Sequence, residues 1–371
     1  MPGLLGTVTM SKKILWLRKE EKPGEWRVAL TPEGVSGLVR AGIDVVVEKF
    51  DHRIFSDREY ERSGARLTEE SWPQAPKEAI ILGLKELNQD QFPIGHRMIY
   101  FSHTFKGQHG ASDVLERYAK GGGKIFDLEF LTNERGARVA AFGYWAGYVG
   151  AALALMGYAH FKHHTVPFPA LDHFGDKEAL IGLLRGQIEG APPKTMVMGA
   201  LGRCGRGAID LLKAVCADIP ISAWDKPEYD ASDKPISAII DHDIFINAVY
   251  LREKIPPMID HGLLSLNQRL SIISDVSCDP NSDNNPVRVY DRVTSLNSPF
   301  IKVSRSGKDV YLQAIDHLPT ILPKEASQEF GRDLYPHLLA LLTNDSLPPV
   351  WQNGLDCYTK TLAGYGLPTL A

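Results

Sequence analysis

A glycine-rich stretch in the middle of the chain has the residue types and spacing to bind a pyrophosphate. The apolar run 195–198 leads into Gly199, Gly202, Gly205 and Gly207, and an amphipathic helical pattern follows. A strand, a glycine turn and a helix bring bare backbone N–H groups against phosphate oxygens. The spacing G-x-x-G-x-x-G differs from the usual G-x-G-x-x-G, so the flanking strand and helix carry the prediction. We therefore predict a dinucleotide-binding turn.

An acidic residue further on specifies which dinucleotide is bound. A second apolar run, 221–224, ends in Asp225. A carboxylate at this place accepts hydrogen bonds from the adenosine ribose hydroxyls and repels a 2′-phosphate. The sequence therefore favours NAD over NADP as the cofactor.

Charged residues of both signs follow four apolar runs in the first third of the chain. In open α/β sheets, ligands lie off the carboxyl ends of the strands. A single charged residue after one strand is best explained as a solvated loop residue. Charged residues after four strands predict that the carboxyl edge of this sheet binds a ligand. These residues are Arg18 and Glu20 after 13–17, Lys85 and Glu86 after 79–84, His103 and Lys106 after 98–102, and Glu129 after 124–128.

The elements that position these residues alternate between strand and helix. Thr31 and Pro32 are typical of the N-cap and first residue of a helix, which ends near Gly42. In the second half we expect strands at 244–246, 272–275 and 310–315. A last helical region at 325–342 and a proline-rich tail should return to the first domain.

This pattern predicts an α/β protein with two Rossmann-like, doubly wound parallel-sheet domains separated by a cleft. We expect residues 10–142 plus 325–371 to form a discontinuous, substrate-side domain. Residues 143–324 should form the NAD-binding domain. The uncharged segment 139–159 is long enough for a membrane span, but its Gly, Ala and Tyr content favours a buried helix.

Composition narrows the class of protein. The 371 residues suggest about two domains, and 44% hydrophobic with 23% charged residues exclude a disordered or fibrous chain. A formal charge of −4 argues against a nucleic-acid partner.

The four cysteines lack paired spacing, which indicates a reducing compartment. Residues 1–9 lack a secretory signal and Met10 is typical of a natural start, so we expect a cytoplasmic protein.

A group of histidines is the one pattern that suggests a metal. His160, His163 and His164 have i, i+3, i+4 spacing, which would place them on one helix face. No acidic or cysteine ligand accompanies them. We therefore interpret them as a solvated helix end and expect no metal site.

Taken together, these stretches resemble one family, the NAD-dependent, L-lysine-forming saccharopine dehydrogenases of fungal lysine biosynthesis. The chain also resembles alanine dehydrogenase and the nicotinamide-binding transhydrogenase subunit in its two-domain plan, but not in these sequence motifs. The matching motifs are L-R-x-E-x-K-P at 17–23, R-x-A-L-T-P at 27–32, G-L-K-E at 83–86, F-S-H at 101–103 with Lys106, D-L-E-F-L at 127–131, R-V-A-A-F-G at 138–143, G-A-L-G-R-C-G at 199–205 and I-D-H-L-P at 315–319.

The resemblance implies oxidative deamination of saccharopine by NAD and water to L-lysine, 2-oxoglutarate and NADH, the last step of the α-aminoadipate pathway. Oxidation of a secondary amine requires that the amine first lose its proton. A base working near pH 7 is a His, or a Lys whose pKa is lowered by burial or nearby cations. The resemblance places these catalytic roles on Lys85 and His103. We assign Lys85 to the substrate amine and His103 to water activation.

The resemblance also implies binding residues. Saccharopine carries three carboxylates, for which Arg18, Lys106 and Arg138 are the expected cations. Glu86 and Glu129 would serve the substrate amine or tune the catalytic base, Phe142 would pack at the domain junction beside the substrate, and Asp316 would lie near the nicotinamide. The full set expected to bind the cofactor is Gly199, Leu201, Gly202, Arg203, Gly205, Asp225 and Asp316.

The sequence departs from the best-known fungal pattern at one cysteine. In that pattern, the cysteine of the glycine turn pairs with another cysteine after a Phe-Ile-Asn strand. Here Cys204 is present, but Ala248 follows Asn247. We therefore expect no disulfide that regulates access of NAD.

Two alternatives stay open. Another amino-acid dehydrogenase of the alanine dehydrogenase-like plan would share the fold, although the cluster of cations argues against so small a substrate. A nucleotide sensor or scaffold protein with a vestigial site would not need both Lys85 and His103. We expect a monomer whose partners are the small molecules saccharopine, L-lysine and 2-oxoglutarate, without a membrane or nucleic acid.

Overall fold

The computed structural model describes residues 13–88, 90–107, 110–188, 190–232, 235–251 and 253–368. The chain divides into two compact units, which are described separately. Unit 1 comprises Met1–Ala141 and Ser327–Ala371, and unit 2 comprises Phe142–Ala326. The roles assigned to the two predicted domains stay predictions. The expectation about residues 1–9 falls outside the described residues.

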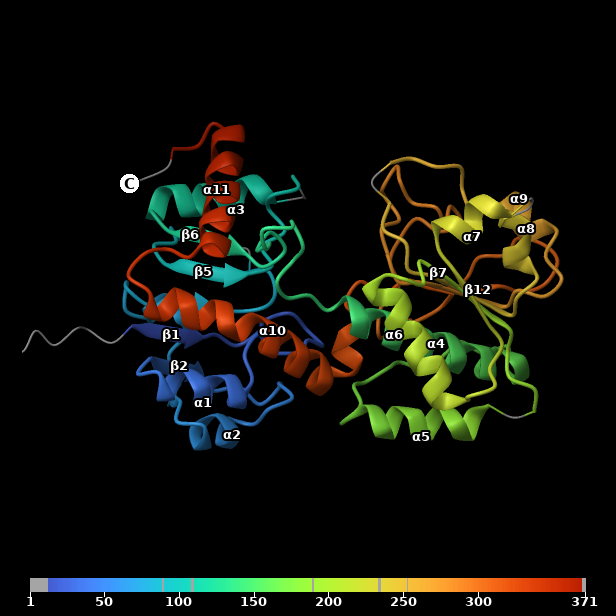
Figure 1. Cartoon of the computed structure of the whole chain (residues 1–371), viewed down its shortest axis with the longest axis horizontal. Helices are drawn as coiled ribbons and strands as arrows, with labels where there is room; N and C mark the ends of the chain where they lie inside the picture. The colour runs from blue at the N-terminus through green and yellow to red at the C-terminus, as the bar shows by residue number, and fades with distance from the viewer. Residues whose placement is uncertain are drawn as a thin grey trace, which may run out of the picture. The chain divides into compact units, whose positions relative to one another are not determined.

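Unit 1 contains a six-stranded sheet in the order β3-β2-β1-β4-β5-β6, and every pairing in it is parallel. Figure 1 shows β6, β5, β1 and β2 following this order. The order reverses between β1 and β4, so the carboxyl ends of these two strands form the topological switch point where ligands bind in such sheets. The strands are β1 (Ile14–Leu17), β2 (Asp44–Glu48), β3 (Arg66–Thr68), β4 (Ile80–Leu82), β5 (Arg97–Tyr100) and β6 (Lys124–Asp127).

Two helices of unit 1, α1 and α2, begin with side-chain caps. The side chain of Thr31 accepts a hydrogen bond from Gly34 N, and Pro32 opens α1, which confirms the predicted start of this helix. In α2, Ser56 and Glu59 form a capping box. The helical segments are α1 (Pro32–Arg40), α2 (Asp57–Arg62), η1 (Trp72–Gln74), α3 (Ala111–Gly121), most of α10 (Pro323–Thr343) and α11 (Pro349–Gly364).

Helix α11 is an element that the sequence analysis missed, because it described the segment only as a proline-rich tail. Pro349 is the first residue of the helix, a position that needs no backbone N–H donor. Trp351 is fully buried, donates a hydrogen bond to the His337 carbonyl at 2.9 Å, and packs edge-on against Phe126 of β6. Figure 1 shows α11 beside β6, the strand against which it packs. The tail therefore contributes to the core of unit 1.

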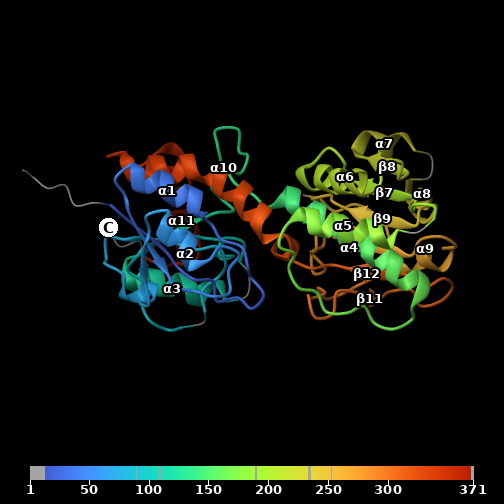
Figure 2. The same ribbon diagram turned by 90° about the horizontal axis from the view of Figure 1, so that it is seen from below.

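Unit 2 contains the second sheet, in the order β11-β12-β10-β9-β7-β8. Its pairings are parallel except for the short edge strand β11. The run β8, β7, β9, β12, β11 can be followed across the sheet in Figure 2, and the order reverses between β7 and β9. The strands are β7 (Thr195–Met198), β8 (Ile221–Trp224), β9 (Ile244–Asn247), β10 (Ile272–Asp275), β11 (Ile301–Lys302) and β12 (Tyr311–Gln313).

The uncharged segment forms the buried helix α4 (Gly143–His163), as predicted. Among the described residues, no helix combines the length and apolarity needed to cross a membrane. A Cβ on Gly147 would lie 1.7 Å from the Cys204 carbonyl oxygen, and a Cβ on Gly207 would lie 1.9 Å from that of Tyr144. These glycines therefore let α4 and α6 approach closely. The other helical segments of unit 2 are α5 (Lys177–Gln187), α6 (Arg203–Val215), α7 (Lys226–Ala231), α8 (Pro235–Ile240), α9 (His261–Ser265) and η2 (Leu318–Ile321).

Candidate active site

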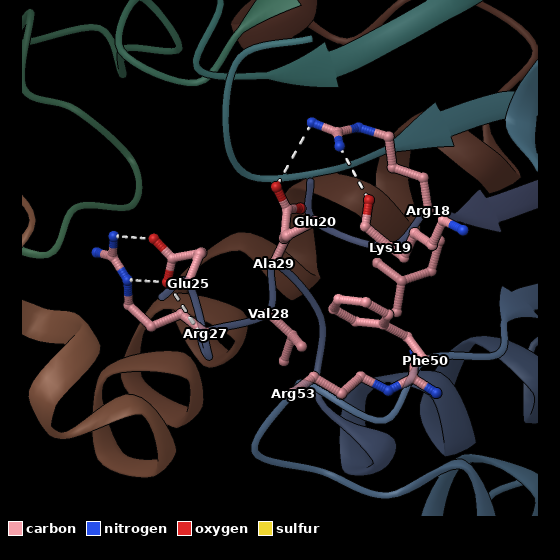
Figure 3. A pocket seen from close by; sticks show the side chains of 10 residues that line it. Arg18, Lys19, Glu20, Glu25, Arg27, Val28, Ala29, Phe50 and Arg53 are labelled. Carbon is pink, nitrogen blue, oxygen red and sulfur yellow. Dashed lines mark hydrogen bonds and ion pairs between the residues drawn. The ribbon is translucent and has the colours of Figure 1, made fainter. Parts of the chain in front are cut away.

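Arg18 and Glu20 join the carboxyl ends of β1 and β4 in unit 1. Arg18 is buried, donates hydrogen bonds to the carbonyls of Lys19 and Lys85, and forms an ion pair with Glu20 at 3.5 Å. Glu20 accepts hydrogen bonds from Leu84 N at 2.6 Å and Lys85 N at 2.8 Å. Figure 3 shows Arg18 reaching Glu20 and Lys19. These contacts fix the backbone that presents Lys85.

Arg18 keeps one unused donor. Its Nε is buried and has no hydrogen-bond partner among the described residues. A Cβ on Gly83 would lie 2.2 Å from this atom, so only glycine leaves room for the guanidinium. Burial raises the pKa of Glu20, and the charge of Arg18 opposes that rise. The other contacts of Arg18 hold the protein itself, and its expected grip on a substrate carboxylate stays a prediction.

A second buried ion pair lies on the loop after β1. Arg27 Nε and Nη2 approach the two carboxylate oxygens of Glu25 at 2.7 Å and 2.6 Å, and Arg27 N adds a third hydrogen bond at 3.0 Å. Figure 3 shows this bidentate pair. Burial opposes ionisation of Glu25, but Arg27 holds its pKa below the usual range. The sequence analysis gave these residues no role, although opposite charges two residues apart, at the junction of two matched motifs, were a usable signal.

Lys85 lies in the environment that a lysine base requires. Its pKa is lowered, first by burial and then by the charges of Arg27 and Lys22, while Glu25 and Glu86 oppose the shift. The neutral amine, which can accept a proton, is therefore more accessible near neutral pH than in a solvated lysine. Both expected influences, burial and nearby cations, are present.

Glu86 and His103 lie near Lys85. One oxygen of Glu86 is 3.4 Å from Lys22 Nζ, and the other is 3.8 Å from His103 Nε2. That second oxygen is buried and accepts no hydrogen bond within the described chain. Burial acts to raise the pKa of Glu86, but its own backbone N–H and the nearby cations lower it overall. The structure therefore places one carboxylate, that of Glu86, near both predicted catalytic residues in unit 1.

A third group combines two cations with one carboxylate. Lys106 Nζ lies 2.7 Å from Glu129 Oε1, and Arg138 Nη1 lies 3.9 Å from the same oxygen. The side chains of Lys106 and Arg138 are nearly half exposed. Because two positive charges share one negative charge, the group keeps a net positive charge that can attract a ligand carboxylate.

The glycines of unit 2 have separate structural tasks. Gly199 has φ 86°, and a Cβ on it would lie 2.8 Å from the Ala248 carbonyl oxygen. A Cβ on Gly205 would lie 2.2 Å from Gly199 O, so this glycine lets α6 pack on the turn. Gly202 caps the N-terminus of α6, whose first turn contains no acidic residue. Its position is the one suited to close approach of a phosphate.

Asp225 is linked to the same turn. Its Oδ2 accepts a hydrogen bond from Leu201 N at 3.0 Å, and Leu201 itself is largely exposed. Asp225 also caps α7 and forms a capping box with Glu228. The carboxylate predicted to bind the ribose is therefore held at the turn predicted to bind the pyrophosphate.

The remaining predicted residues of unit 2 are dispersed. Phe142 is the N-cap of α4 and packs against the apolar core of unit 2. Arg203 opens α6 and lies against Gly143. Asp316 follows β12 and accepts a hydrogen bond from His317. Their roles toward substrate and cofactor stay predictions.

The histidines that suggested a metal site and the cysteines that could form a disulfide have the following surroundings. His160, the first of the three histidines, contacts the Val166 carbonyl at 3.0 Å. No group of three or more metal-binding side chains is found in the described part of the chain. The four cysteines, including Cys204, form no disulfide.

Comparisons with known proteins identify what the chain is similar to. The family model "Alanine dehydrogenase/PNT, N-terminal domain" matches residues 16–149. The saccharopine dehydrogenase (NAD+, L-lysine-forming) of Neurospora crassa is 42% identical over 95% of this chain and 98% of its own. The enzyme of the same name from Candida albicans is 41% identical over 96% and 99%. A solved L-alanine dehydrogenase shares the fold, with a TM-score of 0.66 and 17% identity over 93% of this chain and 94% of its own.

Proposed function

Because the chain belongs to the family of NAD-dependent, L-lysine-forming saccharopine dehydrogenases, we propose that it converts saccharopine, NAD and water to L-lysine, 2-oxoglutarate and NADH. The observation that carries the proposal is the group formed by the partly buried side chains of Lys85, Glu86 and His103. The lowered pKa of Lys85 suits it to the first proton transfer of this reaction.

The steps follow from the chemistry of a secondary amine. Lys85 accepts the proton of the substrate amine, which leaves a lone pair that assists loss of hydride from the neighbouring carbon. NAD supplies the hydride acceptor, and the substrate becomes an imine. His103 takes a proton from the water that adds to the imine carbon, which gives a carbinolamine. Lys85 then returns its proton to the nitrogen, the C–N bond breaks, and the hydroxyl group loses its proton as the C=O bond forms, which releases L-lysine and 2-oxoglutarate.

Glu86 has a positioning and electrostatic role in this scheme. It lies 3.8 Å from His103 and its charge opposes the lowering of the pKa of Lys85. It therefore stabilises the protonated form of each base after that base has accepted its proton. The group of Lys106, Arg138 and Glu129 binds a substrate carboxylate.

The cofactor side rests on unit 2. Backbone N–H groups at Gly202 and the start of α6 hold the pyrophosphate. Asp225, already held by Leu201 N, accepts the ribose hydroxyls and disfavours NADP. We further propose that the enzyme acts as a monomer in the cytoplasm. Light scattering across a concentration series tests the first point, and imaging of a tagged chain in its own cell tests the second.

NADH formation tests the proposal directly. We expect absorbance to rise with saccharopine and NAD, with little rise when NADP replaces NAD. If saccharopine and NAD give no NADH, the proposed reaction is overturned. Turnover of L-alanine with NAD, but not of saccharopine, would favour the alternative amino-acid dehydrogenase.

A further inference from the structure

A buried carboxylate lies beneath the loop that carries His103. Asp127 ends β6 and is 1% exposed. Its Oδ2 accepts hydrogen bonds from Ser102 N at 2.9 Å and Ser102 Oγ at 2.5 Å, and its Oδ1 accepts one from Glu129 N at 2.8 Å. Since all three partners act as donors, these contacts require a side chain that only accepts hydrogen bonds.

The same network reaches the other side of His103. Ser102 Oγ and Thr104 Oγ1 lie 2.8 Å apart, and Thr104 N donates to Ser102 Oγ at 3.3 Å. Ser102 and Thr104 are both buried. The residues before and after His103 are therefore both connected to Asp127, whereas the imidazole itself is 39% exposed.

His103 has a backbone conformation that needs such support. Its φ is 56°, in the left-handed region, and in the described chain it shares positive φ among non-glycine residues only with Cys278. Left-handed conformations are disfavoured for L-residues and persist where the surroundings enforce them. The conformation determines the direction in which the imidazole leaves the backbone, and in this structure it faces Glu86.

We propose that Asp127 is a positioning residue, which holds Ser102 and Thr104 so that His103 keeps its left-handed backbone and its imidazole faces Glu86. Asp127 also accepts a hydrogen bond from Glu129 N, and it thereby fixes the backbone of the residue whose carboxylate pairs with Lys106. This inference rests on the proposed function, because it gives His103 its role in water activation. In the described chain no hydrogen bond or ion pair joins Asp127 to the imidazole, and Asp127 acts through Ser102 and Thr104.

A double-mutant cycle tests whether Asp127 acts through His103. In Asp127→Asn, the amide N–H₂ replaces an acceptor that faces N–H or O–H donors, so the network loses at least one hydrogen bond. We expect kcat with saccharopine to fall about 10- to 100-fold, as for a misplaced catalytic group, while the Kd of NAD changes less than about twofold. In the His103→Gln background the same substitution should lower single-turnover rates by less than about twofold.

Several outcomes overturn the proposal. Losses that multiply in the double variant would mean that Asp127 acts independently of His103. An unchanged kcat per folded site, with a lower melting temperature alone, would make Asp127 merely structural. If Asp127→Asn does not fold, Ser102→Ala replaces it in the cycle, because it removes only the hydroxyl links and keeps the bond from Ser102 N.

A measurement without turnover separates this inference from the proposed function. The ring resonances of His103, assigned in an NMR spectrum by comparison with His103→Gln, should shift in Asp127→Asn. The resonances of His337, elsewhere in unit 1, serve as a control and should not. Unshifted His103 resonances overturn the positioning role, whatever the substrate. Absence of saccharopine turnover in the unchanged enzyme instead overturns the proposed function.

Discussion

In unit 1 the carboxyl ends of β1, β4, β5 and β6 lead into charged side chains, whereas in unit 2 the carboxyl end of β7 leads into glycines. The charges of unit 1 are held in ion pairs and hydrogen bonds, such as Glu25 with Arg27 and Lys106 with Glu129. The turn of unit 2 presents backbone N–H groups, and one of them, Leu201 N, donates a hydrogen bond to the carboxylate of Asp225. One sheet edge therefore offers titratable groups, and the other offers fixed dipoles.

The two units nevertheless share one structural device. Asp275 at the end of β10 is as buried as Asp127, and it accepts hydrogen bonds from Tyr290, Asn247 and the backbone N of Cys278. Cys278 has φ 49°. In both units a buried aspartate at the end of a strand thus accompanies a left-handed, non-glycine residue.

The residue presented by each device differs in its chemistry. Burial raises the pKa of the Cys278 thiol well above its usual range, so this side chain stays protonated and unreactive. His103 instead presents a partly exposed imidazole to Glu86. The comparison teaches that a constrained backbone does not make a site catalytic by itself, because the side chain held there must also have the chemistry that the reaction needs. Substitutions in unit 1 should therefore change turnover, and substitutions at the unit 2 turn should change NAD binding.

The largest difference between the effect on turnover and the effect on NAD binding is expected from Lys85→Met. This substitution keeps the apolar stem of the side chain and removes the base. We expect kcat with saccharopine to fall by about 10²- to 10⁴-fold, the usual contribution of a general base. The Kd of NAD, measured by fluorescence titration, should stay within about twofold. An equal loss in both quantities would contradict the division between the units and make Lys85 structural.

Asp225→Ser should have the opposite signature. Loss of hydrogen bonds to a charged acceptor, worth about 1.5–3 kcal/mol, should weaken NAD binding about 10- to 100-fold. The preference for NAD over NADP should shrink because the carboxylate no longer repels a 2′-phosphate. Turnover at saturating NAD should change little.

Asp225 also caps α7, so this variant needs a matched control. Glu228→Ala removes the other half of the same capping box without removing the ribose acceptor. It should cost about 1 kcal/mol of helix stability at most and leave the Kd of NAD nearly unchanged. A similar loss of NAD affinity in both variants would assign the effect to α7 and not to the ribose contact.

Gly199→Ala tests the glycine turn with a smaller expected effect. A left-handed alanine costs about 1–2 kcal/mol, and its Cβ would lie 2.8 Å from a backbone oxygen of Ala248. We expect NAD affinity to fall about tenfold, measured by calorimetric titration. Gly182→Ala is the control, because a Cβ there meets nothing within 4 Å and alanine favours the helix by about 1 kcal/mol. That variant should melt slightly higher and bind NAD normally, and reduced NAD affinity in it would undermine the test.

The charged edge was predictable from sequence because parallel strands end at a common edge, so residues after several apolar runs must converge. This rule located Lys85, Glu86 and His103 before any coordinates. It could not locate Asp127, whose network with Ser102 and Thr104 involves the loop after the neighbouring strand β5. A buried carboxylate that serves backbone groups leaves no periodic pattern in the chain.

The glycine stretch shows a second limit. From sequence, Gly199, Gly202 and Gly205 are equivalent candidates for the pyrophosphate, and Gly207 continues the same stretch. In the structure, Gly205 and Gly207 serve packing against the turn and α4, which only the positions of neighbouring backbone atoms reveal. Helix α11 was missed for a related reason, because prolines both interrupt helices and begin them.

The smallest effect expected in this comparison concerns Lys22, one of the cations that lower the pKa of Lys85. Lys85 acts as a base, so the rate rises with pH as Lys85 loses its proton. Lys22→Met removes a neighbouring positive charge, which raises the pKa of Lys85 and moves this rise to higher pH. Because Lys22 is partly exposed, its interactions are worth about 1 kcal/mol at most, and the rate near pH 7 should fall no more than about fivefold. Full activity should return at alkaline pH, in contrast to Lys85→Met. A profile that moves to lower pH, or a loss that high pH does not restore, would mean that Lys22 binds substrate and does not tune the base.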